Sequence, residues 1–295
     1  IEEEVKEDIV NQNSNNGDTI EFNKISIVEF SKNLKNLSEI YKQLLKRKHQ
    51  NPKINQHLFN LQRIKSFPSY IFLLDLFNRK DIDDNTIISI LKIIETFMLR
   101  RHICEYRTGE LDNIFAKLIN IDNKDIENNI KTQLLKDLPE DNEFEEKFAA
   151  ADFKREINRA KYILEILEYD VISDKGEFII QSGADVHLEH IIPQTIDTKK
   201  SKKELGDWEE YLGENSLELH KNFVNKIGNF TLLAYDLNII ASNNPFKDKL
   251  FEYSKSNIQI TKNICREFQE KEFTFSEVTK RSVSIAQKAI SLWKF

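Results

Sequence analysis

Cysteine, glycine and proline are all scarce in this chain of 295 residues. The two cysteines, Cys104 and Cys265, lie far apart, and neither belongs to a Cys-x-x-Cys pair. This spacing excludes a disulfide scaffold, argues against a structural zinc knuckle and fits a reducing cytoplasm. Seven glycines and five prolines provide few positions for tight turns, so the composition favours long helices.

Long apolar runs and an excess of basic residues are also missing. No run approaches the roughly 20 apolar residues that span a bilayer, so we expect no membrane contact. The first residues, Ile1-Glu-Glu-Glu-Val, have neither an initiator Met nor a secretory pattern, and we expect a cytoplasmic fragment of a longer protein. The net charge of −6 differs from the basic footprint of most nucleic-acid-binding proteins. Nucleic acid would therefore bind at a local patch or through a part outside this chain.

Apolar residues recur at helical spacing through the first half of the chain. One such stretch covers residues 25–48, and another runs from Ile87 to Met98 after the capping signal Asp84-Asn85. Further amphipathic stretches follow at 108–120, 123–137, 142–150 and 153–169. The simplest interpretation of these stripes is a helical core.

The pattern changes after Asp170, where five of the seven glycines fall within about fifty residues. Short β-prone runs occur at 178–181, 185–191 and 227–233, and helical spacing then returns in the segments to Ser256, 257–269 and 276–292. We therefore predict a mainly α protein. Its expected parts are a linker or frayed terminus at 1–24, a helical domain at 25–170, and a compact site of two strands and a helix with a packed helical tail at 171–295.

Two segments contain the residues that could take part in catalysis or bind a metal ion. Residues 186–194 contain Glu189 and His190 and end at Pro193-Gln194. His190 is the candidate general base, because a neutral imidazole near pH 7 accepts a proton from water. Glu189 offers the oxygen that Mg²⁺ or Mn²⁺ prefers. In a strand the two side chains point to opposite faces, so we expect a kink or loop before Pro193 to let both reach one phosphate; an isolated Glu-His pair is more often a surface pair.

The second segment, residues 227–238, adds two asparagines nine positions apart, Asn229 and Asn238. Their amide oxygens are the neutral groups that a one-metal phosphodiesterase site still lacks. Asn229 at a strand start can also hold a neighbouring loop through backbone groups. The plainer interpretations are a turn residue for Asn229 and a helix cap for Asn238.

Three motifs in this order carry a resemblance to a known family. They are Glu-His-Ile-Ile-Pro-Gln (189–194), Gly-Asn-Phe-Thr-Leu-Leu (228–233) and Leu-Asn-x-x-x-Ser-Asn-x-Pro-Phe-x-x-Lys (237–249). They resemble the ββα-metal nucleases (HNH, or His-Me finger), and in particular the C-terminal nuclease domain of GmrSD-like, modification-dependent restriction enzymes. An Arg-Arg segment within 98–104 and a closing helix from Arg281 to Trp293 extend the resemblance over about residues 85–295.

The resemblance implies a metal-dependent endonuclease that hydrolyses DNA phosphodiester bonds in defence against phage. His190 would activate water, Glu189 and Asn238 would hold one divalent cation, Mg²⁺ or Mn²⁺, and Asn229 would orient the loop that carries the base. The family commonly has an N-terminal domain with an Asp-Gly-Gln-Gln-Arg motif that binds nucleotides, and this motif is missing from the sequence. A nucleotide-binding or recognition domain or subunit outside this chain is therefore an expected partner, together with DNA.

Other residues have two plausible roles. Lys249 would contact a phosphate or lie solvated on a helix, and Arg100 and Arg101 would form structural ion pairs or bind phosphate. His187 would extend the metal shell or contact DNA, and His220 is a weaker candidate of the same kind. A basic cluster would steer DNA or form a solvated loop: Lys199, Lys200, Lys202 and Lys203. Two other functions stay open, namely an inert helical interaction module, which the acidic balance suggests, and an RNA-directed nuclease.

Overall fold

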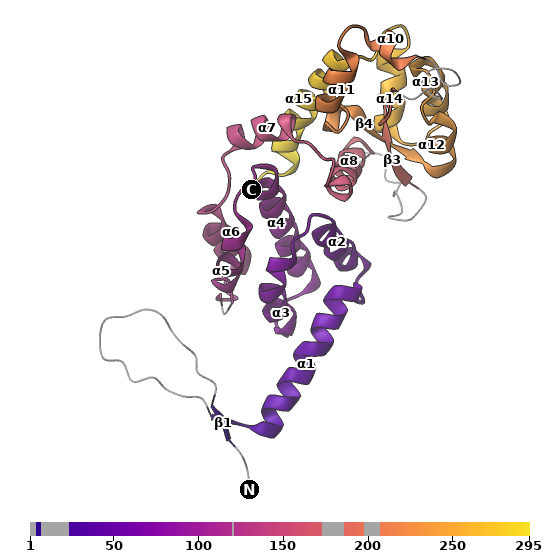
Figure 1. Ribbon diagram of the computed structural model, residues 1–295. Coiled ribbons are helices and arrows are strands. Elements are labelled where there is room, and N and C mark those ends of the chain that lie inside the picture. Colours follow the sequence, from indigo (N-terminus) through magenta and orange to yellow (C-terminus); the bar gives the residue numbers. More distant parts are fainter. Residues whose placement is uncertain (1–3, 7–23, 120, 173–185, 198–206) are drawn as a thin grey trace.

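The computed structural model describes residues 4–6, 24–119, 121–172, 186–197 and 207–295 (Figure 1). The described chain is mainly helical, which confirms the predicted fold class. None of its helices is both long and apolar enough to cross a membrane. The first part contains eight helices in the described residues: α1 (Ile27–Lys46), α2 (Pro52–Arg63), α3 (Tyr70–Asn78), α4 (Asp84–Ile103), α5 (Leu111–Ala116), α6 (Ile126–Leu135), α7 (Asp141–Ala150) and α8 (Ile157–Ile172).

The second part places helices around a two-stranded antiparallel sheet, and Figure 1 shows this assembly at the end of the molecule opposite α1 and α3. Within residues 186–197 and 207–295 the described order is strand, two short helices, strand, and then four helices. The elements are β3 (Val186–His190), α10 (Trp208–Leu212), α11 (Ser216–Phe223), β4 (Phe230–Ala234), α12 (Tyr235–Ala241), α13 (Phe246–Ser254), α14 (Gln259–Phe268) and α15 (Phe275–Leu292).

Capping residues explain where the long helices begin. The Asp83 side chain accepts hydrogen bonds from the backbone N–H groups of Asn85 and Thr86, so the cap of α4 lies one residue before the predicted Asp84-Asn85 signal. The Asn51 side chain caps α2 in the same way, and Pro52 occupies its first turn, where a missing N–H costs nothing.

Several predicted segments differ from the structure. Residues 227–229 form a 3₁₀ turn, and the strand begins only at Phe230. The predicted helix at 108–120 is a 3₁₀ turn at Thr108–Glu110 followed by the short α5. The predicted linker at 1–24 contains a short strand, β1 (Glu4–Lys6), which pairs with β2 (Lys24–Ser26). The β-prone run at 178–181 lies outside the described residues.

One hydrophobic core joins the two parts of the chain. The buried cluster that contains α4 and α8 also includes Phe230 and Leu232 of β4 and Trp293 after α15. Arg100 of α4 donates to the Trp293 carbonyl at 3.2 Å and pairs with Asp141 at 2.5 Å. Arg101 is equally buried and donates to the Asp137 carbonyl. Both arginines thus take the structural role, and the core crosses the predicted boundary at residue 171.

Candidate active site

The site is built on the hairpin of β3 and β4. Glu189 lies opposite Thr231, and His190 lies opposite Phe230. Because successive side chains of a strand alternate between its two faces, the neighbours separate: Glu189 reaches α13, whereas the His190 ring packs edge-to-face on Phe230 with centroids 4.7 Å apart. The two candidate residues therefore have different surroundings within one short strand end.

Asn229 is fully buried and binds the chain immediately after His190. Its side-chain oxygen accepts the N–H of Ile192 at 2.8 Å, and its amide donates to the carbonyls of Ile192 and Val224, both at 2.9 Å. The Asn229 backbone carbonyl also accepts the N–H of Ile191. Three of these four hydrogen bonds go to residues 191 and 192, so Asn229 fixes the segment through which the chain leaves β3.

The 3₁₀ turn that carries Asn229 is held by helix α15. A Cβ on Gly228 would lie 2.0 Å from the Val278 carbonyl oxygen, so only glycine allows this approach of the turn to the helix. The Gly228 N–H donates to Ser282 Oγ at 3.0 Å, and the Arg281 guanidinium donates to the carbonyls of Gly228 and Phe230. Helix α15 thus holds the turn before β4 in place through its packing and hydrogen bonds.

Glu189 is 5 % exposed, and its carboxylate contacts two polar groups of α13. Lys249 donates to Oε1 at 2.6 Å, and the Tyr253 hydroxyl donates to the same oxygen at 2.9 Å. Lys249 also donates to the His190 carbonyl at 2.7 Å. Burial raises the pKa of Glu189 and lowers the pKa of Lys249, because removal from water disfavours both charges.

The surroundings of Lys249 contradict one of its two sequence predictions. Its side chain is 0 % exposed, so the prediction of a solvated helix lysine is wrong. The reason is the spacing on α13, where Lys249 and Tyr253 lie four residues apart on the face that covers the hairpin. Contact of Lys249 with a phosphate stays a prediction. In the structure its ammonium forms an ion pair with Glu189.

His190, the last residue of β3, is buried. Burial, reinforced by the nearby charges of Lys249 and His220, lowers the pKa of His190 to about 4. The Gln194 amide lies 3.3 Å from its Nδ1, and a hydrogen bond with the Asn225 side chain acts in the opposite sense on the pKa. The imidazole is therefore neutral near pH 7, which is the state that a proton acceptor needs.

The remaining predicted site residues occupy separate positions. Asn238 is partly buried on α12, the helix that directly follows β4 and contacts both strands, and its side chain has no hydrogen bond within the described residues. The His187 ring packs on Tyr235 at the start of α12, with centroids 5.0 Å apart. His220 is buried, and its Nε2 lies 2.7 Å from the Pro193 carbonyl oxygen. Lys199, Lys200, Lys202 and Lys203 lie outside the described residues.

A cation at this site would depend on few protein ligands. Within the described ranges, no three His, Cys, Asp or Glu side chains are grouped to hold a metal ion. Both side-chain donors to Glu189 bind Oε1, and none from the described residues binds Oε2. One carboxylate oxygen, one carboxamide such as that of Asn238, and water form a donor set that suits Mg²⁺, which keeps several waters in protein sites.

Sequence reasoning missed the groups that hold the candidate residues in place. Tyr253 and Asn225 were not singled out, and the pairing of Lys249 with Glu189 was not foreseen. The one available signal was the four-residue step from Lys249 to Tyr253, which places both on one helix face. Their pairing with Glu189 depends on how α13 packs on the hairpin.

A search of curated proteins found no match. The family model described as GmrSD restriction endonucleases, C-terminal domain, matches residues 138–288, just over half of the chain. The matched segment includes both hairpin strands, α12, α13 and most of α15. The chain therefore belongs to the family of the GmrSD restriction endonuclease C-terminal domain.

Proposed function

We propose that the protein is a metal-dependent endonuclease of the HNH type that hydrolyses DNA phosphodiester bonds. Membership in a restriction endonuclease family supports a nuclease role in general. The pairing of β3 with β4 and the helix α12 directly after β4 support the finer assignment, because two paired strands and a helix give the ββα-metal site its name. We propose a function in defence against foreign DNA on the same basis.

The observation that carries the proposal is the fixed position of a neutral histidine. Asn229 binds both backbone polar groups of Ile192, two residues after His190. Burial lowers the pKa of His190 to about 4, so the imidazole is neutral at pH 7 and one of its two ring nitrogens carries a lone pair. A general base needs both properties, a defined position and an unprotonated acceptor nitrogen.

In the proposed mechanism His190 takes a proton from water as the water attacks the phosphorus atom. Glu189 and Asn238 would hold one divalent cation, Mg²⁺ or Mn²⁺, which supplies Lewis-acid stabilisation of charge on the leaving oxygen. Lys249 and Tyr253 orient the Glu189 carboxylate through Oε1 and leave Oε2 for the ion. Asn229 holds the segment after the base, and no covalent enzyme intermediate is needed.

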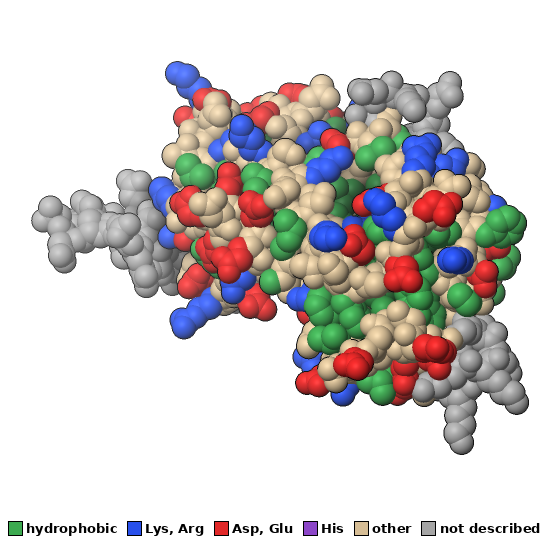
Figure 2. All heavy atoms as spheres, turned by 90° about the horizontal axis from the view of Figure 1, so that it is seen from above, with side chains coloured by type: hydrophobic (Ala, Val, Ile, Leu, Met, Phe, Trp, Pro, Cys, Tyr) green, Lys and Arg blue, Asp and Glu red, His purple; other side chains and the backbone are tan. Residues whose placement is uncertain are grey.

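Recognition of the substrate depends on groups beyond this site. Figure 2 shows acidic and basic side chains intermixed, with hydrophobic ones between them, over the face that it presents. A mixed surface gives little long-range attraction for DNA. We therefore propose that a nucleotide-binding or recognition domain or subunit brings the DNA to this domain.

Cleavage of supercoiled plasmid in the presence of Mg²⁺ or Mn²⁺ tests the proposal. The parent protein should nick or linearise the plasmid, and chelation should stop the reaction. His190→Gln should lower the rate by at least about a hundredfold, since general-base contributions reach 10²–10⁴. His49→Gln is the matched control, because His49 lies between α1 and α2, away from the hairpin, and it should cut like the parent.

Three results would redirect the assignment. Equal cutting by His190→Gln and the parent would reject the proposed base. Cleavage of RNA but not DNA in parallel digestions would leave the chemistry and change the substrate. A protein that forms a stable complex with a partner and cuts neither nucleic acid, even with the partner present, would indicate an inert interaction module.

A further inference from the structure

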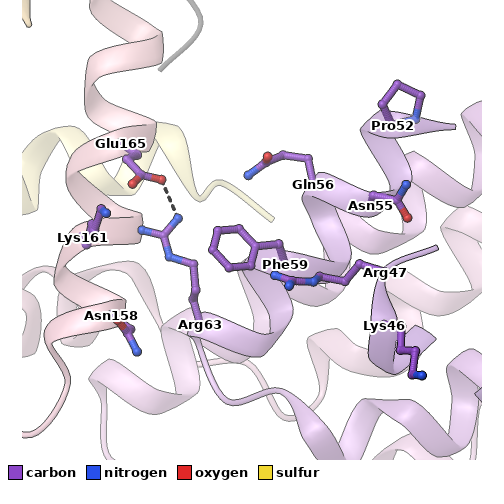
Figure 3. A pocket seen from close by; sticks show the side chains of 10 residues that line it. All are labelled: Lys46, Arg47, Pro52, Asn55, Gln56, Phe59, Arg63, Asn158, Lys161 and Glu165. Atoms are coloured by element: carbon purple, nitrogen blue, oxygen red, sulfur yellow. Dashed lines mark hydrogen bonds and ion pairs between the residues drawn. The ribbon is translucent and has the colours of Figure 1, made fainter. Parts of the chain in front are cut away.

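A pocket in the helical part of the chain has no role in the proposed cleavage. It lies between the end of α1, helix α2 and helix α8, has a volume of about 700 Å³, and none of the predicted site residues lines it. Figure 3 shows the side chains that surround it, from three separate helical segments. A volume of this size is in the range of small-molecule sites.

The lining of the pocket is strongly basic. Four cations face it, Lys46, Arg47, Arg63 and Lys161, against one carboxylate, Glu165. Arg63 pairs with Glu165 at 2.5 Å, so at most one of the four positive charges is matched by an acid of the lining. An uncompensated cluster of cations in a concave site attracts anions, because its surroundings focus the field.

One buried group points to a ligand rather than to a solvated surface. Arg63 is only 7 % exposed, its Nη1 donates to Glu165, and its Nη2 is buried without a hydrogen-bond partner in the described structure. A buried guanidinium N–H without an acceptor costs free energy. Figure 3 shows this guanidinium between Glu165 and the Phe59 ring, on the pocket wall.

The other cations are placed around this buried donor. The exposed Arg47 lies over the Phe59 ring, with its Cζ 4.7 Å from the ring centroid. Lys161 is partly buried, and burial lowers its pKa, so an anion beside it would stabilise its charged form. The pocket therefore combines one buried donor with more exposed ones.

We propose that this pocket binds the terminal phosphate of a nucleotide-sized ligand. Arg63, Arg47 and Lys161 supply the charge-assisted hydrogen bonds, and guanidinium groups match phosphate oxygens in geometry. The inner position of Arg63 selects a terminal phosphate over a phosphodiester inside a strand, since a phosphodiester has a bulky substituent on each side. The ligand is a free organic phosphate or a 5′-phosphorylated DNA end, which share this group.

Calorimetric titration of the whole chain at fixed ionic strength tests the proposal. The probes are pyrophosphate, ATP, and a short oligonucleotide with and without a 5′ phosphate. Pyrophosphate or ATP should bind, or the phosphorylated oligonucleotide should bind more tightly than its unphosphorylated form. Arg47→Gln and Lys161→Gln should each raise the dissociation constant about tenfold. Neither change breaks the Arg63–Glu165 pair.

Lys53→Gln is the matched control, because Lys53 is an exposed lysine of α2 that does not line the pocket. It should change the dissociation constant less than twofold. Equal weakening by Lys53→Gln and Lys161→Gln, no binding of any phosphorylated probe, or equal binding of the two oligonucleotides with no affinity for pyrophosphate and ATP would overturn the proposal. Tighter binding of ATP than of the DNA end would identify the free nucleotide as the ligand class.

Discussion

Each of the two parts of the molecule buries a carboxylate among hydrogen-bond donors, and the two carboxylates differ in what they leave free. Glu95 of α4 uses both oxygens: Oε1 lies 2.7 Å from His57 Nδ1, and Oε2 accepts from Asn60 at 3.2 Å and Tyr162 at 3.1 Å. Glu189 receives both of its side-chain donors on Oε1.

The difference separates a structural carboxylate from one that can take a ligand. The donors of Glu95 come from α2 and α8, so the group ties three helices together and has no oxygen to spare. The side-chain donors of Glu189 come from α13, and they set the orientation of a carboxylate whose second oxygen accepts from no side chain of the described residues. Burial by itself does not distinguish the two, since both are almost fully buried.

The largest expected effect is on cleavage. Glu189→Gln should lower the plasmid-cleavage rate by at least about a hundredfold, because the site loses the one negatively charged ligand proposed for the divalent cation. Glu95→Gln should change the rate less than threefold and lower the free energy of unfolding by about 1–2 kcal/mol through weaker buried hydrogen bonds. Cleavage assays and urea unfolding on both variants check this, at a temperature where both are folded. Comparable rate losses in the two variants would remove the distinction.

The next effect concerns the buried ion pair. Lys249→Met should lower the free energy of unfolding by about 3 kcal/mol, because it leaves the Glu189 charge buried without a partner. The double variant Glu189→Gln with Lys249→Met should recover part of this loss, since no isolated charge remains, and should still fail to cut DNA. Lys247→Met, an exposed position of the same helix, should change stability by less than about 0.5 kcal/mol. A double variant less stable than Lys249→Met would show that the pair is not the source of the loss.

The sequence predicted most of what local periodicity controls. Helix α1 at Ile27–Lys46 and helix α4 at Asp84–Ile103 lie within or close to the predicted stretches, because an apolar stripe at helical spacing must be buried by other elements. Strand β3 at Val186–His190 lies within the predicted run at 185–191. The order of the motifs also predicted the family, which the match to residues 138–288 confirms.

What the sequence could not predict depends on contacts between distant segments. Residues 227–229 have β-prone neighbours, yet they form a 3₁₀ turn, because the Gly228 backbone packs on α15, some fifty residues later. A lysine on an amphipathic helix is usually solvated. Only the packing of α13 on the hairpin makes Lys249 the partner of Glu189. The roles of His190, Asn229 and Asn238 in catalysis stay predictions.

Glycine offers a smaller comparison between the two parts. Gly228→Ala should lower the free energy of unfolding by about 2 kcal/mol, because its Cβ would meet backbone atoms of α15 that cannot move independently. Gly109→Ala, also in a 3₁₀ turn, should change stability by less than about 0.5 kcal/mol, since a Cβ there meets nothing within 4 Å. Thermal or urea unfolding distinguishes the two. A neutral Gly228→Ala would mean that the turn and α15 can separate without loss.

The smallest expected effect is on the pH dependence of stability, and it concerns one histidine in each part. Burial is the largest cause that lowers the pKa of both His102 and His190 to about 4, below the ordinary value of 6.5. Below pH 6.5 the unfolded chain takes up these protons and the folded chain does not, so stability is lost as the pH falls from about 6.5 towards 4. His102→Gln should therefore reduce the stability lost between pH 7.5 and pH 5.5 by about 1 kcal/mol, and His190→Gln should do the same.

Urea unfolding at the two pH values measures the slope, and cleavage at pH 7.5 completes the comparison: His102→Gln should cut DNA like the parent, whereas His190→Gln should not. Unchanged slopes in both variants would show that neither histidine is kept neutral by burial.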